Sequence, residues 1–478
     1  MDDFALLSNP SFANRNILSI WNPFHGSEGL YYRPFQDSIL IILYFLFKNN
    51  PFQYHVLSFI VFIFSSWLIY MLVKRLSNVY SLALLSAIFY IIHPINGILV
   101  NYITASIFSF QLSFLLGSIL LLWEFYERKN GERFYILSLL CFLGTLLCHE
   151  TSLIALGFIS IVVLLFRKEP LKIKIKVLTP YFLILIAYFV FRLNVISLQN
   201  TVIQKMAQFQ INGIEIAATS LQLAIWYISK LFFPQGIVLE WAIPVVRESV
   251  FLFLLKLSLW VIILGGIFYQ CRQNKICLLA LGWFCLGFLP IVFAAFVRPA
   301  HGAMVEPHWL IFSSVGFFIW IAHHCSVLLD RSKYVASTTL MVVLIAGWAS
   351  SSYAYNRLWL DQKSYATYWL SQVPNLKIIN LYLADAYEKE GDYSRARLSY
   401  QNLLLGNNSD MKIYNNLGII AARIGDWALA ESDYQKSLTM MPSAATYHNL
   451  GVLYQKQGLK DKAQKYFIQE QGMSQEHK

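Results

Sequence analysis

Charged side chains are scarce in this sequence. Asp, Glu, Lys and Arg make up 13% of its 478 residues, whereas soluble domains average about 25%. Cysteine is also sparse, because only six are present, and this excludes a small secreted module held together by disulfides. Long apolar runs are abundant instead, and the mean hydropathy is +0.52. These features exclude a soluble enzyme and a disordered protein, and they predict a membrane protein with several spans.

The sequence lacks two motifs, a phosphate-binding loop and a metal-binding cysteine pattern, and their absence argues against two further classes of function. No glycine-rich phosphate loop is evident, so nucleotide-driven chemistry is not expected. The cysteines all lie in or beside apolar runs and lack metal-ligand spacing, so the sequence predicts no metal site, no structural zinc and no disulfide in the outer segments.

Apolar runs long enough to cross about 30 Å of hydrocarbon predict ten membrane spans. The runs are 52–73, 79–93, 105–123, 134–148, 151–166, 177–191, 250–270, 276–297, 308–328 and 334–351. Residues 216–233 are also helical in pattern, but an eleventh crossing there would invert every later loop. We interpret them as a re-entrant or interfacial helix.

Basic residues gather in alternate loops. The short loops after the first, third, fifth, seventh and ninth runs hold 14 Lys or Arg residues. The positive-inside rule places these loops in the cytoplasm. We therefore expect residues 1–51, 192–249, 298–307 and the whole C-terminal tail on the other side. That side is the periplasm if the membrane is a bacterial inner membrane, or the lumen if it is the endoplasmic reticulum.

The C-terminal tail is rich in charge and repeats itself. Residues 352–478 hold 14 Lys or Arg and 12 Asp or Glu residues, a near-neutral balance that does not suggest a nucleic-acid partner. Four columns recur at spacings of 33 or 34 residues: Gly391, Gly425 and Gly458; Leu383, Leu417 and Leu450; Ala396, Ala430 and Ala463; and Tyr400, Tyr434 and Phe467. This pattern is typical of three tetratricopeptide (TPR) repeats, which are stacked helix pairs.

Paired carboxylates open the first outer segment. Asp2 and Asp3 could act as a general base or hold a cation beside a membrane surface. Taken alone the pair is weak evidence, because acidic residues near a terminus are usually only solvated.

The order of several short motifs resembles a known family. The motifs are Asp2-Asp3 with Asn9-Pro10, Tyr32-Arg33-Pro34, Tyr54-His55, His93-Pro94, His149-Glu150 and Glu306-Pro307-His308-Trp309, followed by TPR repeats. In this order they resemble the transmembrane-and-TPR-containing protein O-mannosyltransferases and their bacterial relatives, which are GT-C glycosyltransferases. That family has one more helix before the acidic segment, which gives eleven crossings where this sequence predicts ten.

The resemblance implies a reaction and a donor. The chain would transfer a mannose-like sugar from a polyprenyl-phosphate donor to a hydroxyl of a protein or glycan outside the cytoplasm, with Asp2 as general base and Asp3 as its neighbour. The resemblance does not determine a cofactor, and it leaves the use of a divalent metal open. The alternative is a non-catalytic membrane scaffold that displays its TPR repeats to other proteins.

Cations near the outer surface would hold the phosphate of such a donor, because charge develops on the leaving group. The candidates are Arg33, Arg298, His301 and His308. For the arginines the alternative is contact with lipid headgroups, and for the histidines a structural role. Further residues that could line the site are His93, His149, Glu150 and Glu306. Two of these have simpler explanations, since His93 precedes a proline at a helix end and Glu150 could cap a helix.

The sequence therefore predicts an all-α protein made of a GT-C-like membrane bundle and a TPR solenoid. The predicted segments are an outer acidic segment with an interfacial helix (1–51), the membrane domain (52–351), a linker helix (352–376) and three TPR repeats (377–478). Its partners would be membrane lipids, the lipid-linked donor and a protein acceptor bound by the repeats.

A reporter fused after Lys478 tests the topology. Because the basic loops fix the opposite side in the cytoplasm, we expect activity from a reporter that works only in the periplasm or lumen. An active cytoplasmic reporter at the same position, with a silent periplasmic one, would contradict the orientation.

Overall fold

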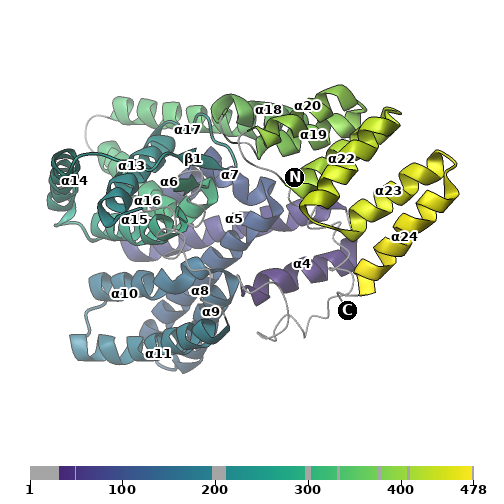
Figure 1. Ribbon diagram of the computed structural model, residues 1–478. Helices are drawn as coiled ribbons and strands as arrows, with labels where there is room; N and C mark the ends of the chain where they lie inside the picture. Colours follow the sequence, from purple (N-terminus) through teal and green to yellow (C-terminus); the bar gives the residue numbers. More distant parts are fainter. Residues whose placement is uncertain are drawn as a thin grey trace. The chain divides into compact units, whose positions relative to one another are not determined.

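The chain folds into helices arranged in two compact units. The computed structural model describes residues 32–48, 50–195, 211–296, 303–330, 334–374, 376, 378–405 and 410–475. Nearly all secondary structure in these residues is α-helical, which confirms the predicted all-α class (Figure 1). Unit 1 is Met1–Arg357 and unit 2 is Leu358–Lys478.

Unit 1 contains the apolar helices. In chain order its elements are α4 (Pro34–Phe47), α5 (Pro51–Ser77), α6 (Tyr80–Ile92), α7 (Pro94–Asn101), η1 (Ile103–Ser106), α8 (Ile107–Glu127), α9 (Glu132–Cys148), η2 (Glu150–Ile154), α10 (Ala155–Phe166), α11 (Leu171–Val195), α13 (Gly213–Phe232), β1 (Trp241–Ile243), α14 (Val250–Cys271), α15 (Lys275–Ala294), β2 (Ala303–Val305), η4 (Pro307–Leu310), α16 (Ile311–Asp330) and α17 (Tyr334–Leu358). The segment predicted to be a re-entrant or interfacial helix forms α13. Polar caps begin several of these helices, and α13 begins with a capping box formed by Asn212 and Glu215.

Six helical segments in the described residues are long and apolar enough to cross a membrane. They are Pro51–Ser77, Ile103–Glu127, Leu171–Leu193, Val250–Cys271, Lys275–Ala294 and Pro307–Val327. Helices α6 and α7 together form one further candidate that is bent by 61° at His93. The other three predicted spans correspond to the shorter α9, to η2 with α10, and to part of α17.

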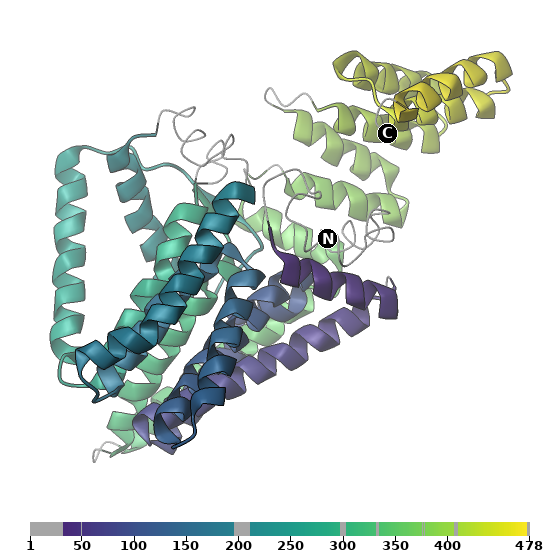
Figure 2. The same cartoon turned by 90° about the horizontal axis from the view of Figure 1, so that it is seen from below.

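The helices of unit 1 pack around α5, α8 and α16. Helix α5 contacts α6 and α8, α8 packs along α9, and α16 lies against both α15 and α6. The apolar core includes fully buried Tyr54, Tyr90, Phe158 and Trp283. Figure 2 shows α14 at the edge of this unit, and none of its most apolar window is buried.

A disulfide joins Cys271 at the end of α14 to Cys277 in the first turn of α15. The sequence did not predict this bridge. The expectation concerned the outer segments, whereas the α14–α15 turn carries Arg272 and Lys275 and belongs to the basic loops.

Unit 2 is a stack of helix pairs. It contains α18 (Gln362–Gln372), α19 (Ile379–Glu390), α20 (Tyr393–Leu404), α21 (Met411–Arg423), α22 (Trp427–Met440), α23 (Ala444–Lys456) and α24 (Lys460–Gln475). Helix α18 packs against α19, and the unit begins at Leu358. The predicted linker segment 352–376 is therefore divided between the end of α17 and this stack.

The repeated sequence columns match the geometry of unit 2. Gly391, Gly425 and Gly458 all have a positive φ, which glycine adopts without strain at the turn between paired helices. The alanine column is buried where the helices cross, and Tyr400 and Tyr434 fill the neighbouring gaps. The three predicted helix pairs, α19–α20, α21–α22 and α23–α24, are confirmed.

Gly418 should be intolerant of a larger side chain. A Cβ atom there would lie 2.6 Å from Tyr434 ring atoms, and Tyr434 is only 3% exposed. Gly418→Val should lower the stability of the TPR stack by about 1–3 kcal/mol through overpacking. Amide hydrogen exchange of residues 411–440 in the full chain measures this loss. Gly472→Val is the matched control, because a Cβ at Gly472 meets nothing within 4 Å, and equal exchange in both variants would contradict the prediction.

Candidate functional site

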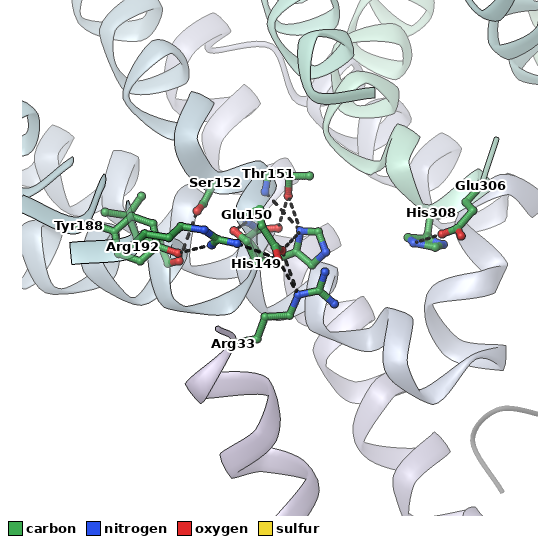
Figure 3. A network of polar contacts seen from close by, with 11 residues as sticks. Arg33, His149, Glu150, Thr151, Ser152, Tyr188, Arg192, Glu306 and His308 are labelled. Atoms are coloured by element: carbon green, nitrogen blue, oxygen red, sulfur yellow. Dashed lines mark hydrogen bonds and ion pairs between the residues drawn. The ribbon is translucent and has the colours of Figure 1, made fainter. Parts of the chain in front are cut away.

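The structure brings together some of the predicted site residues. Four candidates lie outside the described residues: Asp2, Asp3, Arg298 and His301. The six that are described are Arg33, His93, His149, Glu150, Glu306 and His308. Five of these gather in one region of unit 1, seen in Figure 3, and His93 lies elsewhere.

Glu150 is the centre of a cluster formed by three segments that are distant in sequence. It opens η2, immediately after the break that ends α9. Arg33 directly precedes Pro34 at the start of α4, and Arg192 lies in the last turn of α11. Figure 3 shows the two arginine side chains reaching the Glu150 carboxylate from different elements.

Both oxygens of the Glu150 carboxylate are occupied by arginines. Arg33 Nε donates to Oε2 at 2.9 Å, and Arg192 Nη2 lies 2.8 Å from Oε1. Arg192 Nη1 donates to the Tyr188 hydroxyl at 2.8 Å. The Arg192 residue is only 8% exposed, whereas the side chains of Arg33 and Glu150 are each 25% exposed.

Arg192 is a site residue that sequence reasoning missed. It ends a long apolar helix, where a basic residue is ordinarily assigned to the lipid headgroups. Its partner Glu150 lies 42 positions earlier in the chain, and no periodic pattern connects the two. One feature of the sequence indicated this pairing: the predicted topology places Arg192 on the outer side of the membrane, together with Arg33 and Glu150.

The cluster carries a net positive charge at neutral pH. Burial raises the pKa of Glu150, but the charges of Arg33 and Arg192 outweigh this effect, and the pKa lies well below its ordinary value. Burial lowers the pKa of His149 to about 3, although Glu150 opposes this shift. His149 is therefore neutral, Glu150 is ionised, and two arginines face one carboxylate.

His149 caps the helix that follows it. Its Nδ1 accepts from the Thr151 backbone N–H at 3.3 Å, and Glu150 lies in the first turn, where the sequence indicated that it would favour the helix start. The Gln111 side chain donates to the His149 backbone carbonyl at 3.1 Å and accepts from the Thr151 hydroxyl. His149 Nδ1 also lies 3.2 Å from Glu150 Oε2.

Glu306 and His308 form a second pair. His308 Nε2 lies 2.9 Å from Glu306 Oε2, and His308 is 8% exposed. Glu306 follows β2, which pairs antiparallel with β1, and the Tyr227 hydroxyl donates to the Glu306 backbone carbonyl at 2.9 Å. His308 Nδ1 is buried and has no hydrogen-bond partner among the residues that the structure describes.

The Phe108 ring connects the two pairs. Its centroid lies 4.6 Å from that of His149 and 4.9 Å from that of His308. Both imidazoles therefore contact one aromatic ring, and Figure 3 shows His149 next to the Arg33–Glu150–Arg192 cluster.

His93 lies apart from this site. It is fully buried, its Nδ1 accepts from the Ile95 backbone N–H at 3.2 Å, and its Nε2 contacts the Leu231 carbonyl at 3.0 Å. These contacts cap α7 and connect it to α13. They support the explanation of His93 as a helix-end residue rather than as part of the site lining.

The arrangement suits an anionic ligand better than a metal ion. Within the described part of the chain, no group of three or more His, Cys, Asp and Glu side chains is placed to hold a metal ion. The residual positive charge of the arginine cluster favours an anion, and guanidinium groups match the geometry of phosphate oxygens.

Comparison with known proteins identifies the repeat region of the chain. A search of curated proteins found no match. A family model described as tetratricopeptide repeat matches residues 409–471. This range covers α21 to most of α24, so unit 2 contains TPR repeats, as the sequence spacing predicted.

Proposed function

We propose that unit 1 binds a polyprenyl-phosphate-linked sugar and transfers the sugar to a hydroxyl of a protein that the TPR repeats recruit. The observation that carries this proposal is the Arg33–Glu150–Arg192 cluster, in which two guanidinium groups meet one carboxylate in a unit that holds six candidate membrane spans. Guanidinium groups are well suited to binding the oxygens of a phosphate.

The apolar helices support a lipid-linked donor. Six candidate spans provide the environment in which a polyprenyl chain dissolves, and α14 exposes apolar residues on all its sides. A donor with a long apolar chain and one phosphate would match both the helices and the arginine cluster. The predicted cations Arg298 and His301 would add to the phosphate site.

The transfer step needs a base on the acceptor side. Asp2 would take the proton of the acceptor hydroxyl, whose oxygen then bonds to the anomeric carbon of the sugar. The bond from that carbon to the phosphate oxygen breaks, and its electron pair stays on the lipid phosphate. Positive charge at the phosphate lowers the barrier, because negative charge develops there in the transition state.

Asp2→Asn tests the chemical step. Transfer of mannose from undecaprenyl-phosphate-mannose to a Ser/Thr-containing peptide should fall by about 10²- to 10⁴-fold, because the general base is lost. Thermal stability and helical content should stay the same. Asp410→Asn, at a cap in unit 2, is the matched control. Activity of Asp2→Asn within a factor of a few of wild type would exclude Asp2 as the base.

A second candidate function is a non-catalytic membrane scaffold. The TPR match favours it, because stacked helix pairs present a surface that commonly binds proteins. In this alternative unit 1 anchors the repeats and binds no donor.

Removal of residues 377–478 separates the two functions. If the repeats recruit the acceptor of an enzyme, transfer to a whole protein should fall far more than transfer to a short peptide, because only the protein uses remote binding. Steady-state kinetics on both acceptors measure the difference. Equal losses would contradict the recruiting role, and no transfer by the wild-type chain to either acceptor would favour the scaffold.

A further inference from the structure

The Glu150 carboxylate connects two cations that would otherwise repel each other. Arg33 and Arg192 approach its two oxygens at 2.9 and 2.8 Å. Two guanidinium groups in a region of low dielectric repel strongly unless an anion lies between them. Glu150 therefore offsets the repulsion between them.

The two arginines differ in how they are held. Arg192 is nearly buried and uses separate nitrogens to contact Tyr188 and Glu150. Arg33 contacts Glu150 through its Nε, and its side chain is 25% exposed. Arg192 thus fixes the carboxylate, and the carboxylate fixes the more accessible Arg33.

We propose that Glu150 is a positioning residue for phosphate recognition, and that Arg192 supports it. This inference rests on the proposed lipid-phosphate donor and assigns these two residues a specific role toward it. Glu150 holds Arg33 in the orientation that recognises the phosphate of a lipid ligand. It does not exchange a proton and does not contact the phosphate.

The positioning role and a simple charge effect predict opposite changes in phosphate affinity when Glu150 is neutralised. Glu150 is an anion near an anion-binding site, so its removal should strengthen phosphate binding if only the total charge mattered. If Glu150 positions Arg33, its neutralisation should weaken binding, because the two arginines then separate. The sign of the change decides between the two explanations.

The experiment compares two lipid probes on the purified full chain in lipid nanodiscs. Undecaprenyl phosphate and undecaprenol differ only in the phosphate, so the ratio of their dissociation constants reports phosphate recognition. The wild-type chain should prefer the phosphate, and Glu150→Gln should reduce that preference roughly tenfold or more, as for a lost charge-assisted interaction. Glu150→Asp should retain part of it.

Glu169→Gln is the matched control. It makes the same change at a glutamate that pairs with Arg167 at 3.0 Å in a different loop, and the phosphate preference should not change. Three results would overturn the inference: an unchanged or increased preference in Glu150→Gln, an equal loss of affinity for both lipids, or a wild-type chain without phosphate preference. A phosphate preference that depends on Glu150 in a chain that transfers no sugar would overturn only the proposed transfer reaction.

Discussion

Polar groups among apolar helices need partners within the protein, and this requirement governs the arrangement of unit 1. Where a helix breaks inside the apolar region, its first N–H groups lack intrahelical acceptors. His93 at the α6–α7 bend and His149 at the α9–η2 break each supply Nδ1 to a backbone N–H two residues later. Buried imidazoles thus take the capping role that Asn50 and Asn274 have at more polar helix ends.

The same requirement explains the charged cluster. A lone carboxylate at the position of Glu150 would be costly to bury, and so would a lone guanidinium at the position of Arg192. Together with Arg33 they form a set in which each charge has an opposite partner. Arg33, η2 and the end of α11 are held together by this set, so the geometry of a ligand site here would depend on all three segments.

Local and periodic features could be predicted from the sequence, whereas pairings between distant segments could not. The 33- or 34-residue spacing identified the helix pairs of unit 2, since each repeat uses the same glycine turn and alanine crossing. The Glu150–Arg192 pair has no such period, and neither has the pairing of Trp241 with Val305 that positions Glu306. The sequence indicated that Glu150 lies in the first turn of a helix, as observed, but it could not show that the His149 side chain turns back to accept from the backbone.

The exposure of helix α14 determines which substitutions this helix can tolerate. Of its 22 residues only Cys271 is buried, and its most apolar window lies wholly outside the packed core. Lys256 pairs with Glu248 just before the helix, and the remaining side chains of α14 are overwhelmingly apolar. Exchange of one apolar residue for another along this helix would alter no core contact. Its sequence is thus constrained by composition and length rather than by order, and it can diverge faster than the helices packed around α16.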